Sequence, residues 1–369
     1  MSFLRIRAMA RKEWIQIRRD RLSLAMAFAL PAMLLVIYAY AITFDVDNIL
    51  TVIYDQDKSS TSRDLIARFA ESKYFSIVAS IDSFREIDRY LDSGGAKVAI
   101  TIPSDFSKDL HTGRPAAIEI VIDGSESNTA TIAQGYIAGI AEAFNRRESG
   151  VSVRPVIDLR NRVWYNPELK SRNFLIPGLI AIIMSVIISL LISLAVSREW
   201  DRGTMEQLIS TPVKPIEIVT GKLVPYFVVG FADTVMSVLI ATLLLRVPLR
   251  GGVLFLLLVS AIFLFGGLCF GLLISIGARN QLTASQIAML TSFLPSFLLS
   301  GFVFTISNMP AALQGVTYLV PARYFVSVLK GVFLKAIGFN VLVTEVIFLS
   351  LYGSVVFLLA VKKLQKRIE

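Results

Sequence analysis

Six long apolar segments dominate this sequence of 369 residues. Hydrophobic residues make up 54% of the chain and charged residues only 18%, a balance too apolar for a single soluble domain. A membrane-spanning helix needs roughly 20 apolar residues. Six segments reach that length: Leu22–Phe44, Asn173–Val196, Leu223–Leu245, Val253–Ile276, Ala284–Phe304 and Val341–Val361. Because lipid offers backbone groups no hydrogen-bond partners, the sequence predicts a polytopic α-helical membrane protein with six transmembrane helices.

Basic residues at both ends of the chain set the expected orientation. Seven precede the first apolar segment, at Arg5, Arg7, Arg11, Lys12, Arg18, Arg19 and Arg21, and four follow the last, at Lys362, Lys363, Lys366 and Arg367. Since basic residues stay on the cytoplasmic side, both termini are predicted to be cytoplasmic, which agrees with an even number of crossings. The first segment, residues 22–44, is expected to remain as an anchor because it is too long for the core of a signal peptide.

Residues 45–172 differ from the rest of the chain in charge and pattern. They hold 16 Lys and Arg against 19 Asp and Glu, a net charge of −3 in a chain of +9. Strands are predicted at Ile49–Asp55, Phe75–Ser80, Lys97–Ile102, Ile118–Ile122 and Val151–Tyr165, and helices at Thr61–Ser72, Ser83–Leu91 and Ser127–Arg147. This alternation predicts an extracytoplasmic α/β domain between the first and second spans.

Two further segments are expected to lie along the membrane surfaces. In residues 1–21, apolar side chains recur at steps of three and four (Phe3, Ile6, Ala10, Trp14 and Ile17), which predicts a cytoplasmic amphipathic in-plane helix, with a disordered basic tail as the alternative. Residues 280–322 carry no charge, and Pro310, Gly315 and Pro321 interrupt the later part of this stretch, within residues 306–337. Short helices at the outer membrane face are predicted there, before the last span.

The residues needed for catalysis or metal binding are scarce. The chain has one histidine, His111, and one cysteine, Cys269, which argues against His/Cys metal sites and nucleophilic triads. It has no G-x-x-x-x-G-K-[ST] phosphate loop and no basic stripe interleaved with aromatic residues of the kind that binds nucleic acid. No catalytic residue, cofactor or metal is therefore predicted on this chain, and no nucleic-acid partner.

A charged insert between the second and third spans is the most specific local pattern. Residues 198–208 read R-E-W-D-R-G-T-M-E-Q-L, and a T-P pair follows at Thr211 and Pro212. Gly203 and Thr204 are expected to end the spanning helix and to start a short cytoplasmic helix, with Thr204 as its cap. The predicted polar docking surface consists of Arg198, Glu199, Asp201, Arg202 and Glu206, with Met205 and Leu208 as apolar contacts. The alternative for this insert is an ordinary solvated loop.

Polar residues inside the predicted spans form a second group of candidates. Asp233 lies midway along the third span, where an acid must face protein or water, either as a pathway group or as a structural pair with a hydroxyl or amide on a neighbouring helix. In the fifth span, Ser292, Ser296 and Ser300 follow one face. Such a seam either packs helices closely or lines a cavity.

Several short motifs, taken in order, resemble one protein family. The order R-E-W-D-R-G-T-M-E-Q-L-x-x-T-P, followed by E-I at Glu217 and G-K at Gly221, is similar to the cytoplasmic signature of ABC-2 type permeases of the drug-efflux kind. The remaining motifs are D-G-S-E-S-N at Asp123–Asn128, Y-N-P at Tyr165–Pro167, I-P-G at Ile176–Gly178, S-G-F at Ser300–Phe302, N-M-P at Asn308–Pro310 and P-A-R-Y-F at Pro321–Phe325. Trp200 and Asp201 depart from the family pattern, which usually has a basic residue and Glu there.

The resemblance implies a function and a set of partners. Such permeases act as two membrane subunits, identical or closely related, with two separate ATP-binding subunits that hold the ATP and Mg²⁺. It implies that the segment at about 198–212 is a coupling helix, with Arg198, Glu199, Arg202, Gly203, Thr204, Met205, Glu206, Leu208, Thr211 and Pro212 at the contact with the ATPase. It also implies an exporter of drug-like or amphiphilic molecules in a bacterial inner membrane. A periplasmic adaptor protein and an outer-membrane channel are further partners that such an exporter can have.

Two alternative functions remain at this point. Export of lipid or of a lipid-linked polymer is the first, because other members of the wider superfamily carry such cargo. A membrane sensor, with an outer domain that binds a ligand and a cytoplasmic elbow that contacts a regulator, is the second.

Overall fold

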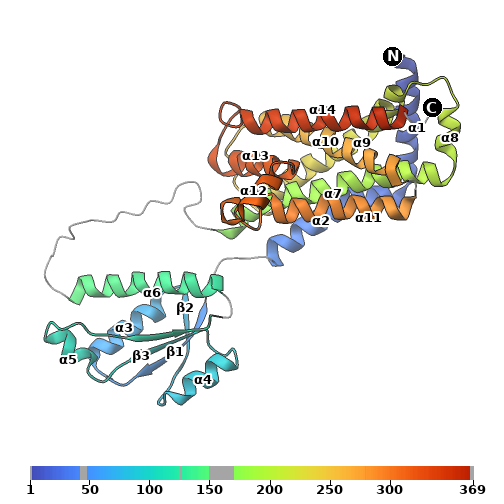
Figure 1. Ribbon diagram of the computed structural model, residues 1–369. Coiled ribbons are helices and arrows are strands. Elements are labelled where there is room, and N and C mark those ends of the chain that lie inside the picture. Colours follow the sequence, from blue (N-terminus) through green and yellow to red (C-terminus); the bar gives the residue numbers. More distant parts are fainter. Residues whose placement is uncertain (1, 42–47, 125–126, 149–169, 279, 366–369) are drawn as a thin grey trace. The chain divides into compact units, whose positions relative to one another are not determined.

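The computed structural model of this chain describes residues 2–41, 48–124, 127–148, 170–278 and 280–365, which form two compact units (Figure 1). The membrane unit comprises Met1–Ile42 with Val163–Glu369, and the sheet domain comprises Thr43–Arg162. The predicted Val151–Tyr165 strand and the Tyr165–Pro167 motif lie outside the described residues.

Six helices of the membrane unit are long and apolar enough to cross a bilayer, as predicted. They are α2 (Arg21–Ala41), α7 (Ser171–Asp201), α9 (Pro215–Leu239, continued by a π-helical turn at Ile240–Leu244), α10 (Val253–Ala278), α11 (Gln281–Leu299) and α14 (Val343–Gln365). Helix α7 is the central one, because 78% of its most apolar window is buried, against 17% for α2. Helices α2, α9, α10 and α11 pack against α7, while α14 packs mainly against α10. The spans leave apolar faces for lipid or for another protein.

Two spanning helices extend further than their apolar segments. Helix α7 continues past Val196 to Asp201, so Arg198 and Glu199 belong to its last turn and not to the insert. Helix α9 begins at Pro215, eight positions before Leu223, because Pro215 suits the first helical turn and Glu217 accepts a hydrogen bond from the Lys214 backbone N–H. Charged residues are thereby brought to the inner ends of both helices.

The remaining helices of the membrane unit lie at its two ends (Figure 1). Helices α1 (Phe3–Arg19) and α8 (Thr204–Ile209) are at one end. A 3-10 turn at Ile306–Asn308 and helices α12 (Ala311–Thr317) and α13 (Pro321–Lys335) are at the other. The basic helix predicted before the first span and the short helices predicted before the last span are both present.

The face by which α1 packs differs from the predicted one. Its buried residues are Met9, Glu13 and Ile17, while Phe3 and Trp14 are exposed. The apolar periodicity indicated a helix correctly, but Glu13 occupies the packed face because it has charged partners there. Those partners are described below.

The sheet domain has a mixed four-stranded sheet with strand order β2-β1-β3-β4. Strand β1 (Ile49–Asp55) pairs in parallel with β2 (Phe75–Ser80) and β3 (Val98–Ile102), and β3 pairs antiparallel with β4 (Glu119–Ile122). Helices α3 (Ser60–Glu71) and α6 (Ser127–Glu148) lie on one face of the sheet and α4 (Arg85–Asp92) on the other (Figure 1). Every residue of β3 is buried, as expected for a strand covered on both faces.

The predicted α/β architecture is confirmed, with two local differences. Helix α4 begins at Arg85, after Phe84, and no side-chain hydrogen bond caps it. Helix α5 (Phe106–His111) was not predicted, because it is a single short turn whose Phe106 packs into the domain core.

Candidate functional site

The hairpin between α7 and α9, predicted to be cytoplasmic, is built around Gly203. This residue has φ 67°, a left-handed conformation that ends α7 and that residues with a Cβ rarely adopt. Helix α8 starts at Thr204, whose Oγ1 donates to the Glu199 carbonyl oxygen at 3.2 Å. The expectation that Thr204 caps α8 is therefore corrected: its hydroxyl bonds back to α7, and Gly203 occupies the cap position.

The predicted docking residues fall into two groups. Arg202, Thr204, Glu206, Thr211 and Pro212 are exposed, and Gly203 is half-buried. Met205 is fully buried in the core of the membrane unit, and Leu208 packs against that core. Met205 therefore attaches α8 to the permease itself, while the docking role of the half-buried Leu208 stays a prediction.

Glu199 is also inside the protein, in a cluster of four charged residues that we call the inner clasp: Lys12, Glu13, Glu199 and Lys222. Lys222 Nζ lies 2.8 Å from Glu13 Oε1 and also donates to Glu199. Lys12 pairs with Glu199 and lies 3.5 Å from Glu13 Oε1. The side chains of Lys222 and Glu13 are only 1% and 2% exposed. The Lys12 side chain is 46% exposed. Its charge and that of Lys222 balance the two carboxylates, which lowers the cost of burying Glu13, Glu199 and Lys222.

A second ion pair joins α7 to the corner between α1 and α2. Arg198 Nη1 lies 2.6 Å from Asp20 Oδ2, and the Asp20 carboxylate also accepts hydrogen bonds from the Ser23 backbone N–H and hydroxyl. Burial opposes the charge, yet the bonds from Arg198 and Ser23 lower the pKa of Asp20 to about 2. Arg198 therefore binds another part of the same chain, in contrast to the predicted role in docking.

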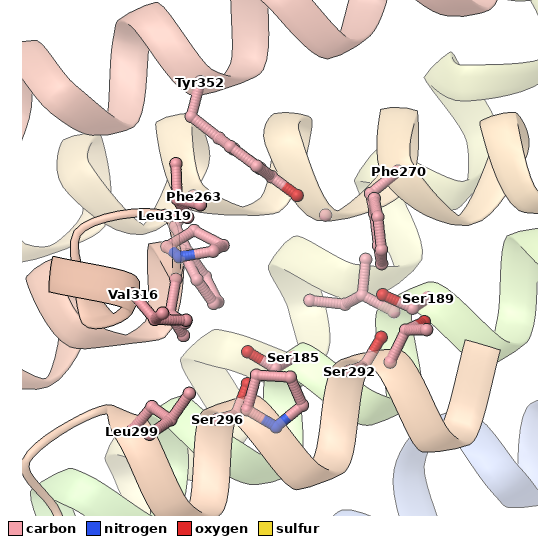
Figure 2. A pocket seen from close by; sticks show the side chains of 16 residues that line it. Ser185, Ser189, Phe263, Phe270, Ser292, Ser296, Leu299, Val316, Leu319 and Tyr352 are labelled. Atoms are coloured by element: carbon pink, nitrogen blue, oxygen red, sulfur yellow. The ribbon is translucent and has the colours of Figure 1, made fainter. Parts of the chain in front are cut away.

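Polar residues of the spans meet at a cavity of about 290 Å³. Ser185 and Ser189 of α7 and Ser292 and Ser296 of α11 contribute hydroxyl groups to its wall. These serines lie opposite the rings of Phe263, Phe270 and Tyr352 (Figure 2). Val316 of α12, Leu319 and Val320 of the following turn, and Pro321 at the start of α13 also line the cavity. The seam on α11 thus lines a cavity, and the arrangement suits an apolar molecule with few polar groups.

Ser300 and Asp233 do not join this cavity wall. Ser300 lies just beyond α11, where its Oγ accepts the Phe302 backbone N–H at 3.3 Å. Asp233 is 1% exposed on α9, and neither carboxylate oxygen has a hydrogen-bond partner among the described residues. The structural pair expected for Asp233 is therefore not formed within the described part of the chain.

Two of the sequence motifs meet in one packing contact. A Cβ added to Gly178 would lie 2.2 Å from Phe302 Cδ2, so the Phe302 ring fills the space that a side chain at Gly178 would occupy. Lys330 Nζ donates to the Gly301 carbonyl oxygen at 3.1 Å and lies 3.8 Å from the centre of the Phe174 ring. The I-P-G and S-G-F motifs thus pack directly against each other through Gly178 and Phe302.

The P-A-R-Y-F motif fixes the first turn of α13. Arg323 lies 3.9 Å over the Tyr318 ring and donates to Thr317, while Tyr324 stacks on Phe348 and Phe325 stacks on Phe263. These aromatic contacts hold the cavity-lining Pro321 in place.

Sequence reasoning missed the inner clasp and most of the cavity wall. The G-K motif held a signal for the clasp, since Gly221 and Lys222 are among the residues of α9 that contact α1. For Glu13, the signal was its i, i+4, i+8 spacing with Met9 and Ile17. No sequence signal pointed to Ser185, Ser189 or Tyr352, which look like any other polar residues in an apolar helix.

Among the described residues, no group of three His, Cys, Asp or Glu side chains is arranged to hold a metal ion. The arrangement thus consists of the hairpin between α7 and α9, a charged clasp next to it and a cavity between the spanning helices.

Comparison with known proteins identifies the family. Residues 21–362 match the family described as ABC-2 family transporter protein. The chain is 39% identical over 353 residues to the probable multidrug ABC transporter permease YbhS of Escherichia coli K12, covering 95% of this chain and 93% of the relative. It is 30% identical to the probable multidrug ABC transporter permease YbhR, covering 90% of each, and 27% identical to the inner membrane transport permease YhhJ, covering 86% and 85%. With a match along almost its whole length, the chain belongs to the ABC-2 family and is the permease subunit of an ABC transporter, which implies ATP-binding subunits as partners and no nucleotide site of its own.

Proposed function

We propose that this permease moves drug-like or amphiphilic molecules outward across the inner membrane of a bacterium, driven by ATP hydrolysis on two separate ATP-binding subunits. The similarity to YbhS, which extends over both the cytoplasmic hairpin and the cavity helices, carries this proposal. The names of YbhS and YbhR support a drug-like cargo, and the name of YhhJ supports the inner membrane.

The exposed part of the hairpin is the proposed contact with the ATPase. Arg202, Thr204, Glu206, Thr211 and Pro212 are accessible, and Gly203 sets the turn that presents them. Arg198, Glu199, Met205 and Leu208 support this surface from behind. A push on α8 therefore reaches α7 and α9, because the hairpin is short, joins the two helices and packs against α7.

The cavity between α7, α10, α11 and α14 is the proposed substrate contact. Its wall is largely apolar, and Ser292 Oγ is buried without a hydrogen-bond partner among the described residues. A buried hydroxyl without a partner favours a ligand that supplies one. The segment from Val316 to Pro321 is the proposed cover at the outer end, and directional transport follows when ATP favours one of two states that bind the cargo differently.

The remaining assembly follows the same proposal. Two permease subunits, identical or closely related, act together, with both termini in the cytoplasm and the sheet domain in the periplasm, where it docks an adaptor protein leading to an outer-membrane channel. Exposed apolar side chains on α11, such as Leu290 and Leu294, support contact with a second permease or with lipid.

The test uses the permease co-purified with its ATP-binding subunits and reconstituted in vesicles. We expect an amphiphilic dye to stimulate ATP hydrolysis and to be transported. The Ser296→Leu variant, which fills part of the cavity, should lose most of the stimulation by dye while basal hydrolysis continues.

The matched control is Ser354→Leu, which places the same side chain on an exposed face of α14. Stimulation by labelled lipid but not by any dye would replace the drug-like cargo with a lipid. Absence of ATP-binding subunits from the purified complex, with a kinase in their place, would support the sensor instead.

A further inference from the structure

The inner clasp links three elements that are far apart in the sequence. Lys222 stands at its centre, because it bonds both Glu13 of α1 and Glu199 of α7. The side chains of Glu13, Glu199 and Lys222 are at most 5% exposed. Removal of one charge from such a cluster leaves an opposite charge buried without its partner.

Close backbone packing reinforces the clasp between α1 and α9. A Cβ added to Gly221 would lie 2.6 Å from Met9 Cβ, so only glycine at this position allows α1 to approach so closely. At the start of α1, the Ser2 backbone N–H donates to Glu217 Oε1 at 2.6 Å, and Arg5 lies 3.5 Å from Glu217 Oε2. Helix α1 is therefore fastened to α9 along most of its length.

The far end of α1 is joined to α7 and α2 through Asp20. Its carboxylate binds Arg198 of α7 and also accepts hydrogen bonds from Ser23 in the first turn of α2. Displacement of the inner end of α7 consequently pulls on the start of the first span.

We propose that α1, α8 and the cytoplasmic ends of α7 and α9 move as one rigid body during transport, with Lys222 as the central positioning residue of the clasp. The coupling element is then larger than α8: force received by the hairpin passes through the clasp to α1 and onward to α2. This inference rests on the proposed function, since it assigns a path to the force delivered by the ATPase.

The clasp is expected to stay intact because removing one partner from a buried ion cluster costs more free energy than the intact cluster contributes to stability. Separation of α1 from α9 and α7 would break the contacts of Glu13 with Lys222 and of Lys12 with Glu199, so the joint resists opening. The contacts between the spans themselves are largely apolar and can slide at a lower cost. Movement is therefore expected between the clasped body and the outer half of the bundle, not inside the clasp.

The direct test measures distances between spin labels in the assembled complex, with and without a non-hydrolysable ATP analogue. Labels on cysteines introduced at Ala8 of α1 and Gln207 of α8, two exposed positions, should keep the same distance distribution. Labels at Gln207 and at Ala312 of α12 should change theirs. The single native cysteine, Cys269, is buried and is replaced by serine.

Each outcome of this experiment has one meaning. A change between positions 8 and 207 on nucleotide binding overturns the rigid body, provided that 207 to 312 also changes. If neither distance changes and hydrolysis does not drive export in the unlabelled complex, the proposed function fails instead.

A set of charge variants tests the role of Lys222. Lys222→Met should lower export per ATP hydrolysed roughly tenfold or more, because one buried carboxylate then lacks its partner. Glu13→Gln combined with Lys222→Met removes one charge of each sign and should restore most of the coupling, as should Lys222→Arg alone. Lys362→Met, an exposed lysine at the inner end of α14, is the control and should behave as the wild type.

Export per ATP distinguishes positioning from a purely structural role, because it is independent of how much protein folds. If Lys222→Met reduces only the amount of inserted subunit and export per ATP stays normal, Lys222 is not a positioning residue. Failure of the double variant to recover would equally contradict a balanced clasp.

Discussion

The role of a charged residue at the end of a spanning helix depends on whether neighbouring side chains enclose it. Glu199 and Arg202 are three positions apart, yet Glu199 is enclosed by two lysines while Arg202 is exposed at the turn. Burial of an unpaired charge costs much free energy, and a contacting charge of opposite sign offsets part of that cost. Substitution of Glu199 therefore tests the internal clasp, and substitution of Arg202 tests docking.

Glycine at position 178 makes room for Phe302, and this gives a residue-scale prediction. Gly178→Ala should lower the free energy of unfolding by about 1–3 kcal/mol, because the added methyl overlaps the Phe302 ring. Thermal unfolding in detergent measures the effect. Gly315→Ala on α12 is the matched control, since a Cβ at Gly315 meets no atom within 4 Å. An equal change in both variants would show that the Phe302 contact is unimportant.

At the scale of elements, the ends of the helices carry most of the specific polar contacts. Helix α11 is an example: Asn280 Oδ1 accepts the backbone N–H of Leu282 at 2.8 Å, and Asp201 of α7 accepts that of Gln281 at 3.0 Å. Backbone N–H groups in a first helical turn have no partner within their own helix. These two acceptors therefore fix both the start of α11 and its position beside α7.

Loss of the α11 cap should be measurable. Asn280→Ala is expected to destabilise the membrane unit by about 1 kcal/mol, because the first turn of α11 loses its side-chain acceptor. Asn280→Asp should retain stability, since a carboxylate accepts the same hydrogen bonds. Melting temperatures of the three proteins provide the comparison, and equal values for the alanine and asparagine forms would contradict the capping role.

The turn between α7 and α8 gives a second element-scale prediction. Gly203→Pro cannot keep φ at 67°, because the proline ring fixes φ near −65°. We expect this variant to insert in the membrane but to lose roughly tenfold or more of its export, since one misplaced element disturbs the contact with the ATPase. Quantified export in vesicles, normalised to inserted protein, measures it. Glu206→Lys, which alters charge but not the backbone, should also uncouple hydrolysis from export.

For the whole molecule, we expect the second span to separate the sheet domain and α8, so that they lie on opposite sides of the membrane. A membrane-impermeant maleimide applied to intact spheroplasts should label a cysteine at Lys58, in the sheet domain, and should not label one at Gln207. After the membrane is opened, both should react. Labelling of position 207 in intact spheroplasts would overturn the orientation and with it the cytoplasmic docking surface.

Much of this architecture follows from the sequence alone, because the physical constraints are local. Lipid requires long apolar helices, and alternation of short apolar runs with amphipathic helices requires a sheet covered by helices. The limits of β1 and β2 agree with prediction residue for residue. The place of the hairpin was also readable, because Gly203 interrupts a helix at the edge of an apolar segment.

The tertiary structure alone decided which polar residues are enclosed and by what. Periodicity predicts that α1 is a helix, but it does not reveal that Lys222, more than 200 positions away, supplies the charge that allows Glu13 to be buried. In the same way, four serines on two helices form one cavity wall only after α7 and α11 pack together. Pairing across space depends on the relative placement of helices, which is a property of the packed molecule and not of any single segment.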